Sequence, residues 1–550
     1  MKFRWIPVLA AAVVACAGCV SKNNELGGSM IPVSHSYKVV SPDPVHIPVK
    51  MKVADSLSAY SSTRITIGSI RDDSELGLST RSSCITLVPM FLDELDYGTN
   101  PVFKSFHFSA ALDSVSVSSL NQSKILQNVF VYELSEALDP DYKTYCNSTP
   151  AHGSDLVTTN IPLINGSDSL SFNFTREFGE KYLTITPEEL ADMTLYTARF
   201  PGIYISTNEP EGQGGRFNIY DLQLDYDSDY GYIKGNVAEL KFNSTWTVDG
   251  ESVNKDSTLF FYFSATDFYD LDSLFTNSGT GSFPQYCANV TSDATASLAG
   301  NAGEYLYATG GAGVKPVFSA KMLRDTAMAI IAANGHDPKK AVINKASITM
   351  QYFALDEKFE TLYMIPEILS PTCRIVSDDG NVSFMGLTDA SDSNEDQGNR
   401  HLSRMSYSPD ITYHLQSLIQ LDDDNAQLLN GSYDIWMLIM HNDIVVTTTS
   451  DNSELSEYYN YLAYQSYMGN MYGGYGGYGY GGYGGYGSYG YSNYYNYALM
   501  AQMYGSSSTS TSSSANLDRD RYYYCKLHGP EAAEEDMRPS FSFTYSIPNE

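Results

Sequence analysis

Apolar and polar residues alternate in short runs along most of the chain, which is the pattern of half-buried β-strands. Phe103–Val117 alternates in this way, and Val129–Leu134 is rich in β-branched and aromatic residues. Similar short runs follow at Phe172–Phe174, Ile203–Ile205 and Ile219–Tyr226. Asn, Gly, Ser and Pro separate the runs, so the pattern predicts an all-β, mainly antiparallel fold of β-sandwich or jelly-roll type.

Helical patterns are few and short. Lys321–Asn334 carries apolar residues on one helical face and is followed by Gly335, a common helix stop. Thr186–Glu189 has the spacing of a capping box with Pro at the first helical position. The segment Asp410–Ile419 reads as a strand end that turns into a helix. We therefore expect a few short helices beside the strands.

The second half of the chain repeats the order of elements in the first. Each half has an alternating strand, then a strand-and-helix segment, then an apolar strand led by glycine. The segments are Leu112–Val117, Leu170–Leu183 and Phe200–Ile205 in the first half, and Ile343–Met350, Ile411–Leu421 and Gly431–Leu438 in the second. This order predicts two tandem β-sandwich domains, at residues 37–275 and 276–550.

The amino-terminal segment has the features of a bacterial lipoprotein signal. Lys2 and Arg4 precede an apolar run that is too short to span a bilayer, and the run ends at Cys16-Ala17-Gly18-Cys19. Small residues before a cysteine resemble a lipobox, whose cysteine thiol receives diacylglycerol. We therefore predict a signal over residues 1–19 with lipidation of Cys19. Cys16 also fits the pattern and stays an alternative.

Residues 20–36 follow as a polar tether. Lys22 and Glu25 in this segment look like a degenerate form of the signals that send Bacteroidota lipoproteins to the cell surface, and a plain spacer is the alternative. The segment predicts attachment to the outer membrane through the lipid and leaves open whether the protein faces the cell surface or the periplasm. Stable attachment requires more than one acyl chain, such as palmitate.

Charge and cysteine content narrow the classes of partner. The chain of 550 residues has 64 acidic and 33 basic residues and a net charge of −31, which argues against binding nucleic acid. Beyond the signal, Cys84, Cys146, Cys287, Cys373 and Cys525 are scattered without a C-x-x-C spacing, so neither a zinc site nor a thioredoxin-type motif is indicated. Isolated buried thiols are the favoured interpretation, with one or two disulfides as the alternative.

Two low-complexity tracts interrupt the second half. Residues 469–491 are almost entirely Gly and Tyr, and residues 506–514 are Ser and Thr. Neither tract has apolar alternation, so we predict one disordered loop over about residues 451–515, inserted between strands. Its tyrosines could stack on sugar rings, and the candidates are Tyr475, Tyr478, Tyr480, Tyr483 and Tyr486. A tolerated insertion without such a role is the alternative.

Several segments together resemble a known family. They are LGGSMIP at 26–32, ITIGSIRDDSELG at 65–77, VFVYELSEALDP at 129–140, FPGIYIS at 200–206, INKASITM at 343–350 and RPSFSFTYS at 538–546. The chain resembles the Bacteroidota lipoproteins catalogued as domain of unknown function DUF4270, over nearly all of its mature length except the Gly/Tyr tract. The resemblance implies a β-rich outer-membrane lipoprotein, and it brings no catalytic residues.

Motifs for catalysis or metal binding are weak. The chain has neither a G-x-S-x-G elbow nor an H-E-x-x-H helix. Thr309–Lys315 imitates a phosphate loop, but Pro316 stands where Ser or Thr is required, so a turn between strands is favoured. Calcium could bind Asp389, Asp392, Asn394 and Asp396, or the acidic segment Leu421–Asn425, yet solvated acidic loops explain both better.

The sequence therefore predicts a lipid-anchored, non-catalytic component of the cell envelope that binds outer-membrane or other envelope proteins. No catalytic residue, metal site or cofactor other than the covalent lipid is predicted. A cell-surface glycan-binding protein is the second interpretation, and an enzyme acting on glycans is the third.

Overall fold

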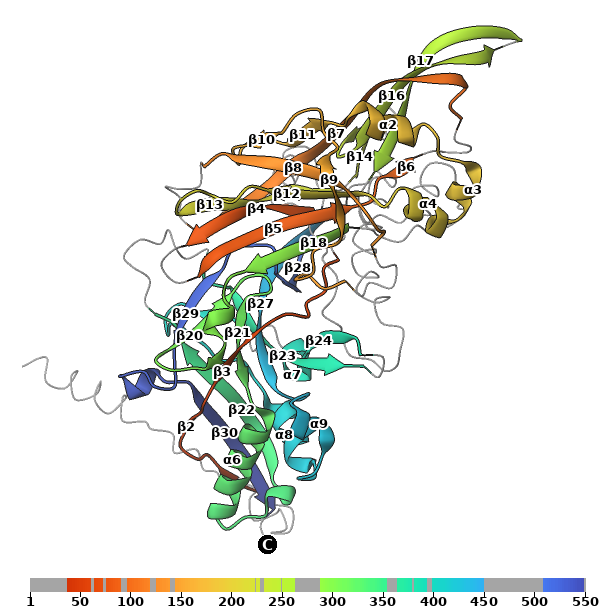
Figure 1. Cartoon of the computed structure of the whole chain (residues 1–550). Coiled ribbons are helices and arrows are strands. Elements are labelled where there is room, and N and C mark those ends of the chain that lie inside the picture. The colour runs from red at the N-terminus through yellow and green to blue at the C-terminus, as the bar shows by residue number, and fades with distance from the viewer. Residues whose placement is uncertain are drawn as a thin grey trace, which may run out of the picture.

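The structure is a computed structural model of the whole chain. It describes residues 37–60, 64–72, 76–90, 96–118, 125–138, 144–222, 224–227, 232–248, 250–262, 287–353, 364–377, 380–392, 398–449 and 508–548. Strands dominate these ranges and all of their pairings are antiparallel, which confirms the predicted all-β class. Figure 1 shows an elongated molecule with one group of strands above another.

The upper group is a sheet of thirteen strands that folds over on itself. Its strands are β4 (Arg64–Asp72), β5 (Gly77–Ile85), β6 (Val88–Met90), β7 (Thr99–Val117), β8 (Gln127–Leu134), β9 (His152–Leu156), β10 (Leu163–Ile164), β11 (Leu170–Asn173), β12 (Ile203–Thr207), β13 (Gly214–Asp221), β16 (Ala238–Val248), β17 (Glu251–Tyr262) and β18 (Cys287–Asp293). The short pair β14 (Leu224–Asp227) and β15 (Tyr232–Gly235) stands apart from this sheet.

The fold-over occurs at β5. Residues 77–81 of this strand pair with β4, residues 83–85 pair with β12, and β18 runs along residues 79–85. The sheet therefore divides at β5 into two layers. Helix α2 (Arg176–Tyr182) packs on β7, and buried aromatic side chains fill the core, among them Phe106, Phe108, Phe174, Phe178 and Tyr182. Helices α3 (Pro187–Ala191) and α4 (Met193–Arg199) follow in the chain.

The lower group contains two sheets. One has seven strands: β19 (Gly300–Asn301), β3 (Lys50–Val53), β21 (Val314–Phe318), β27 (Ile435–Thr449), β23 (Ile368–Val376), β24 (Val382–Gly386) and β28 (Ser508–Leu517). The other has six: β1 (Tyr37–Val40), β2 (Val45–His46), β30 (Ser540–Pro548), β22 (Val342–Gln351), β26 (Ser406–Tyr407) and β25 (Arg400–His401). Strands β20 (Tyr305–Thr309) and β29 (Tyr524–His528) form a separate pair.

Helices cover the lower group. They are α6 (Ala320–Ala333), α7 (Thr388–Asp392), α8 (Thr412–Gln420) and α9 (Ala426–Asn430), with short 3-10 turns at η4 (Ala296–Leu298), η5 (Pro338–Lys340) and η7 (Glu535–Met537). The predicted helix at 321–334 is confirmed as α6, because its Leu323, Ala327 and Ile331 form the buried stripe. The predicted capping box is confirmed at the start of α3, where Thr186 and Glu189 cap each other.

Strand pairings cross the boundary predicted near residue 275 in both directions. Strand β3, from the start of the chain, pairs with β21 in the lower group. Strand β18, which lies after the boundary, pairs with β5 in the upper group. Strands β1 and β2 also join the lower group through β30. Pairing therefore does not follow the ranges 37–275 and 276–550, because each range donates a strand to the other group.

The two groups share an order of strands. The succession β5–β12–β8–β9 in the upper group matches β21–β27–β23–β24 in the lower one. The first strand of each set pairs on its other side with the strand that comes from the other range of the chain. This strand is β18, beside β5, in the upper group and β3, beside β21, in the lower group. Helix α2 packs on β7 as α8 packs on β22. Each helix precedes the second strand of the succession, with α3 and α4 between α2 and β12 and α9 between α8 and β27.

The Ser/Thr tract contradicts one prediction. From residue 508 onward it forms part of the strand β28, which pairs with β27 from Met440↔Leu517 to Thr449↔Ser508. The predicted loop over 451–515 is therefore wrong for residues 508–515. The open edge of β27 supplies backbone partners, so this strand forms without apolar alternation. The Gly/Tyr tract lies outside the described residues.

Candidate functional site: a buried charged junction

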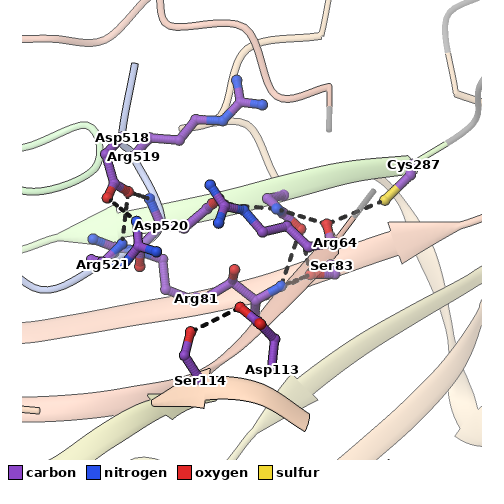
Figure 2. A network of polar contacts seen from close by, with 12 residues as sticks. Arg64, Arg81, Ser83, Asp113, Ser114, Cys287, Asp518, Arg519, Asp520 and Arg521 are labelled. Carbon is purple, nitrogen blue, oxygen red and sulfur yellow. Dashed lines mark hydrogen bonds and ion pairs between the residues drawn. The ribbon is translucent and has the colours of Figure 1, made fainter. Parts of the chain in front are cut away.

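Charged and polar side chains meet inside the protein where the two groups of strands join. They come from the segment Asp518–Tyr523, which connects β28 to β29, and from Arg64, Arg81, Asn289 and Asp293 of the upper group. We call this set of residues the junction. Figure 2 shows Arg64 and Arg81 reaching from the upper strands toward the segment Asp518–Arg521. Buried residues of the junction are Arg64, Arg81, Asn289, Asp518, Arg519 and Asp520. The side chain of Asp293 is 4% exposed.

An apolar layer surrounds the junction. Its side chains come from the segment at residues 54–59, from β5, β8, β12 and β18 above, and from β21, β24 and β27 below. They include Ala54, Leu57, Cys84, Leu134, Cys146, Tyr204, Val290, Val317, Phe384, Trp436 and Leu438. The two groups of strands therefore share a continuous core, and the charges lie in surroundings that strengthen electrostatic interactions.

Arg81 and Asp293 form the first ion pair of the junction. Nη1 of Arg81 donates to Oδ1 of Asp293 across 3.0 Å, and the two side chains are 1% and 4% exposed. Nε of Arg81 also donates to the backbone oxygen of Asp520 across 3.3 Å. The guanidinium thus connects β5, β18 and the segment 518–523, which lie far apart in sequence.

Asp520 forms the second ion pair and is completely buried. Its Oδ2 lies 3.4 Å from Nε of Arg64, and its Oδ1 accepts from Nδ2 of Asn289 across 3.2 Å. Oδ1 of Asn289 in turn accepts from Oγ of Ser83 across 2.7 Å. The carboxylate is therefore bound to β4, and through the amide to β5 and β18.

Asp518 orders the segment itself. Its Oδ1 accepts from the backbone N–H groups of Asp520 and Arg521, and its Oδ2 accepts from Nη1 of Arg521 across 2.5 Å. The hydroxyl of Tyr523 also donates to Oδ2, across 2.9 Å. Burial raises the pKa of Asp518, but Arg521 and Arg64 lower it more, so the pKa lies below its usual range.

Two further contacts fasten the segment to the upper group. The backbone N–H of Tyr522 donates to Oγ of Ser116 across 2.9 Å, and its hydroxyl donates to Oδ2 of Asp72 across 3.2 Å. Nη2 of Arg519 donates to the backbone oxygen of Tyr60. Each charged or hydroxyl-bearing residue from 518 to 523 thus has a protein partner. In this arrangement the paired charges hold the two groups of strands together.

The phosphate-loop imitation is a turn between β20 and β21, as predicted. Nζ of Lys315 donates to the backbone oxygens of Thr309, Gly311 and Gly313 across 2.6, 3.1 and 2.9 Å. These three carbonyls accept from the N–H donors of Lys315 that a bound phosphate would need. Burial lowers the pKa of Lys315 to about 8. The lysine therefore stabilises its own turn.

The calcium candidate Asp389 binds backbone groups instead. Its two carboxylate oxygens accept from the N–H groups of Tyr413 and His414, across 2.6 and 3.0 Å, at the start of α8. Asp392 closes α7, and Asn394 and Asp396 lie outside the described residues. In the acidic segment 421–425, Asp423 accepts from Arg324 and Asn425 caps α9. Within the described ranges, three or more His, Cys, Asp or Glu do not gather as a metal site.

The other predicted site residues cannot be placed. Cys16, Cys19 and the tyrosines Tyr475, Tyr478, Tyr480, Tyr483 and Tyr486 lie outside the described residues. Cys84, Cys146, Cys287, Cys373 and Cys525 are buried free thiols, which confirms the favoured interpretation of these cysteines. None of the helices in the described part of the chain is long and apolar enough to cross a bilayer.

The junction was missed in the sequence. Its signal is the alternation Asp518-Arg519-Asp520-Arg521 directly before an aromatic run. Strict alternation of opposite charges next to core residues could have indicated paired buried ions, whereas we interpreted charges in general as a solvated surface. Arg64 directly precedes the alternating run Ile65–Ile67, which is a second signal of the same kind.

Comparison with known proteins gives no relative. No family model, no curated protein and no solved structure matches the chain.

Proposed function

We propose that this protein is a lipid-anchored outer-membrane lipoprotein that acts as a structural or protein-interaction component of the cell envelope. The observation that carries the proposal is the amino-terminal signal, with Lys2 and Arg4, a short apolar run and a cysteine after small residues. Cys19 receives the lipid, and Cys16 is the alternative. The resemblance to lipoproteins of the DUF4270 family supports the same location.

The use of the buried polar groups supports a non-catalytic role. Catalytic groups are usually left accessible, with pKa values poised for proton transfer. Here the buried carboxylate of Asp520 is paired with Arg64, and Lys315 is enclosed by three carbonyl oxygens. Nε2 of His414 donates to the backbone oxygen of Tyr433 across 3.1 Å. These groups hold the fold together, which suits a rigid scaffold.

Metabolic labelling tests the anchor. Cells that express the full chain are fed labelled palmitate, and the protein is immunoprecipitated. We expect label in the parent and in Cys16→Ala, and its loss in Cys19→Ala. Loss in Cys16→Ala alone would move the lipid to the alternative site. An unlabelled parent protein would refute the anchor and with it the proposed function.

Cross-linking in intact cells tests the interaction role. A structural component should recover the same few envelope proteins in independent preparations, and a Cys19→Ala variant that no longer reaches the membrane should lose them. Protease treatment of intact cells then decides between the surface and the periplasmic face. Recovery of no reproducible partner would argue against the interaction role while leaving the anchor intact.

Glycan binding is the second candidate, and an aromatic surface favours it. Tyr305 of β20 and Phe353, which follows β22, have ring centroids 5.5 Å apart, and Phe353 stacks on His528 of β29 at 3.9 Å. Nζ of Lys526 lies 4.1 Å from the Tyr305 centroid. These side chains are half-buried, so their rings are partly open to solvent. Aromatic faces of this kind suit sugar rings.

A glycan array with two variants tests this candidate. One variant lacks residues 469–491, with Tyr475, Tyr478, Tyr480, Tyr483 and Tyr486, and the other carries Tyr305→Ala and Phe353→Ala. Loss of binding in the first variant would assign the glycan to the Gly/Tyr tract, and loss in the second would assign it to the aromatic surface. A parent protein that binds no glycan would exclude this candidate.

A further inference from the structure

Three large apolar side chains lie exposed together at one end of the lower group. Tyr37 and Val39 of β1 are each 61% exposed, and Val342 of β22 is 51% exposed. Val39 and Val342 both pair directly with Ser546 of β30, from opposite sides. Directly paired residues share a face of the sheet, and Tyr37 is two positions from Val39. The three side chains therefore form one patch, which we call the basal patch.

The basal patch is not a part of the core that has come open. Val40 and Ile547, which point the other way, pack against the buried core. Ser546, between Val39 and Val342, accepts from Nδ2 of Asn344 across 2.6 Å. The outer face is thus formed by paired strands with satisfied polar groups, and the apolar side chains stand out from it.

Two lysines lie beside the basal patch. Lys345 pairs with Thr544 on the same outer face, and Lys340 stands two residues before Val342. Both are exposed. The side chain of Lys38, which pairs with Ile547, lies on the opposite face of β1. The nearest acids along these segments are Asp337, which caps η5, and Asp43 after β1.

The position of the basal patch matches the proposed anchor. Tyr37 begins the described part of the chain, 18 residues after Cys19. Extended chain covers at most about 3.5 Å per residue, so the tether reaches about 60 Å or less from the lipid. Figure 1 shows the end of β30, marked C, at the opposite pole from the hairpin β16–β17. Since β1 pairs with β30, the tether leaves the molecule at the pole that carries the patch.

We propose that the basal patch rests on the phospholipid surface and sets the orientation of the protein. This inference relies on the proposed lipid anchor. Tyrosine suits the level of the head groups, because its ring is apolar and its hydroxyl is polar. Lys340 and Lys345 favour contact with anionic head groups. A short tether raises the effective concentration of the surface to the millimolar range, so a weak contact is enough. The hairpin β16–β17 then points away from the membrane.

Fluorescence quenching tests the orientation. The lipidated protein is reconstituted into vesicles of phosphatidylethanolamine and phosphatidylglycerol that contain a spin-labelled lipid. A bimane is attached to Val39→Cys in the basal patch or to Val253→Cys on β17, where Val253 is 41% exposed. The five described cysteines are buried, so the label goes to the new thiol. We expect strong quenching at position 39 and none at position 253.

A matched pair of variants distinguishes docking of the basal patch on the membrane from simple tethering near it. Tyr37→Ser with Val342→Ser, added to Val39→Cys, should lose the quenching. Leu163→Ser with Leu195→Ser, which changes side chains that are 57% and 51% exposed elsewhere, should keep it. Equal quenching at 39 and 253, or quenching that survives the patch variant, would overturn the proposal. So would protection of the label without vesicles, because a second copy of the chain would then cover the patch.

The two proposals fail in different ways. If the anchor is wrong, the protein does not incorporate palmitate and does not float with the vesicles. If only the docking is wrong, the protein floats with the vesicles but the label at position 39 is not quenched.

Discussion

Arg81 and Asp293 pair across 3.0 Å inside the protein, although 212 positions separate them in the chain. The pair joins β5 to the exchanged strand β18, and Arg81 also contacts the backbone of Asp520. One guanidinium therefore connects the upper group to a strand from beyond the predicted boundary and to the segment that follows β28.

Asp293→Ala should strongly destabilise the protein, because it leaves the Arg81 charge buried without its carboxylate. Removing one partner of a buried pair costs about 3–5 kcal/mol. Urea titration followed by intrinsic fluorescence measures the loss. The control is Glu180→Ala, which breaks an exposed pair with Arg176 and should cost about 1 kcal/mol or less. Similar losses in the two variants would contradict the role assigned to the junction.

Asp389→Ala should lower stability by about 1–3 kcal/mol, because two backbone N–H groups at the start of α8 lose their acceptor. Thermal melting with millimolar calcium and with a chelator measures this effect and tests the calcium alternative at once. We expect the same melting temperature in both buffers for the parent. Asp424→Ala, at an exposed position, is the control. Calcium that raises the melting temperature of the parent but not of Asp389→Ala would assign a metal site here.

Local patterns predicted much of the fold. The helix at 321–334 follows from its 3.6-residue period and from Gly335, which has a φ of +81° after the helix. The strand class follows from alternation. The strand β28 could not be predicted in this way, because its Ser/Thr tract has no apolar face and pairs through the backbone of β27. The exchange of β3 and β18 depends on pairing between distant segments, which periodicity does not encode.

The junction shows a second limit of prediction from sequence. A charged residue looks the same in a sequence whether it is solvated or buried with a partner, and only the fold brings Asp520 to Arg64. Asp389 shows the converse, because a plausible metal ligand is used by backbone donors. The lipid anchor depends on a segment outside the described residues, so it stays a prediction from sequence.

Gly202→Ala should destabilise the protein severely. Gly202 has a φ of +107°, and an added Cβ would lie 2.2 Å from the backbone oxygen of Ile85. Both the strained backbone and the contact with β5 act in the same direction, so we expect a loss of about 3 kcal/mol or more. Gly212→Ala is the matched control, since an added Cβ there meets nothing within 4 Å. A variant at 202 as stable as the one at 212 would contradict the close approach of β12 to β5.

His414 should make the protein less stable in mild acid. Burial on the inner face of α8 lowers its pKa from 6.5 to about 4, so the unfolded chain binds a proton there before the folded protein does. Stability is therefore full above about pH 6.5 and falls toward pH 4, by about 3 kcal/mol in total. Urea midpoints between pH 7 and pH 4 measure this slope.

The variant His414→Gln isolates this contribution, because glutamine can donate to the Tyr433 carbonyl but does not titrate. Between pH 7 and pH 4 its stability should fall less steeply than that of the parent. The difference in slope should correspond to the uptake of one proton on unfolding. Burial also lowers the pKa of His441 to about 4, so the variant keeps a slope from that residue. Gln420→Ala, on the same helix, should shift all midpoints equally and leave the slope of the parent unchanged. Parallel curves for the parent and His414→Gln would show that this histidine is not buried as a neutral side chain.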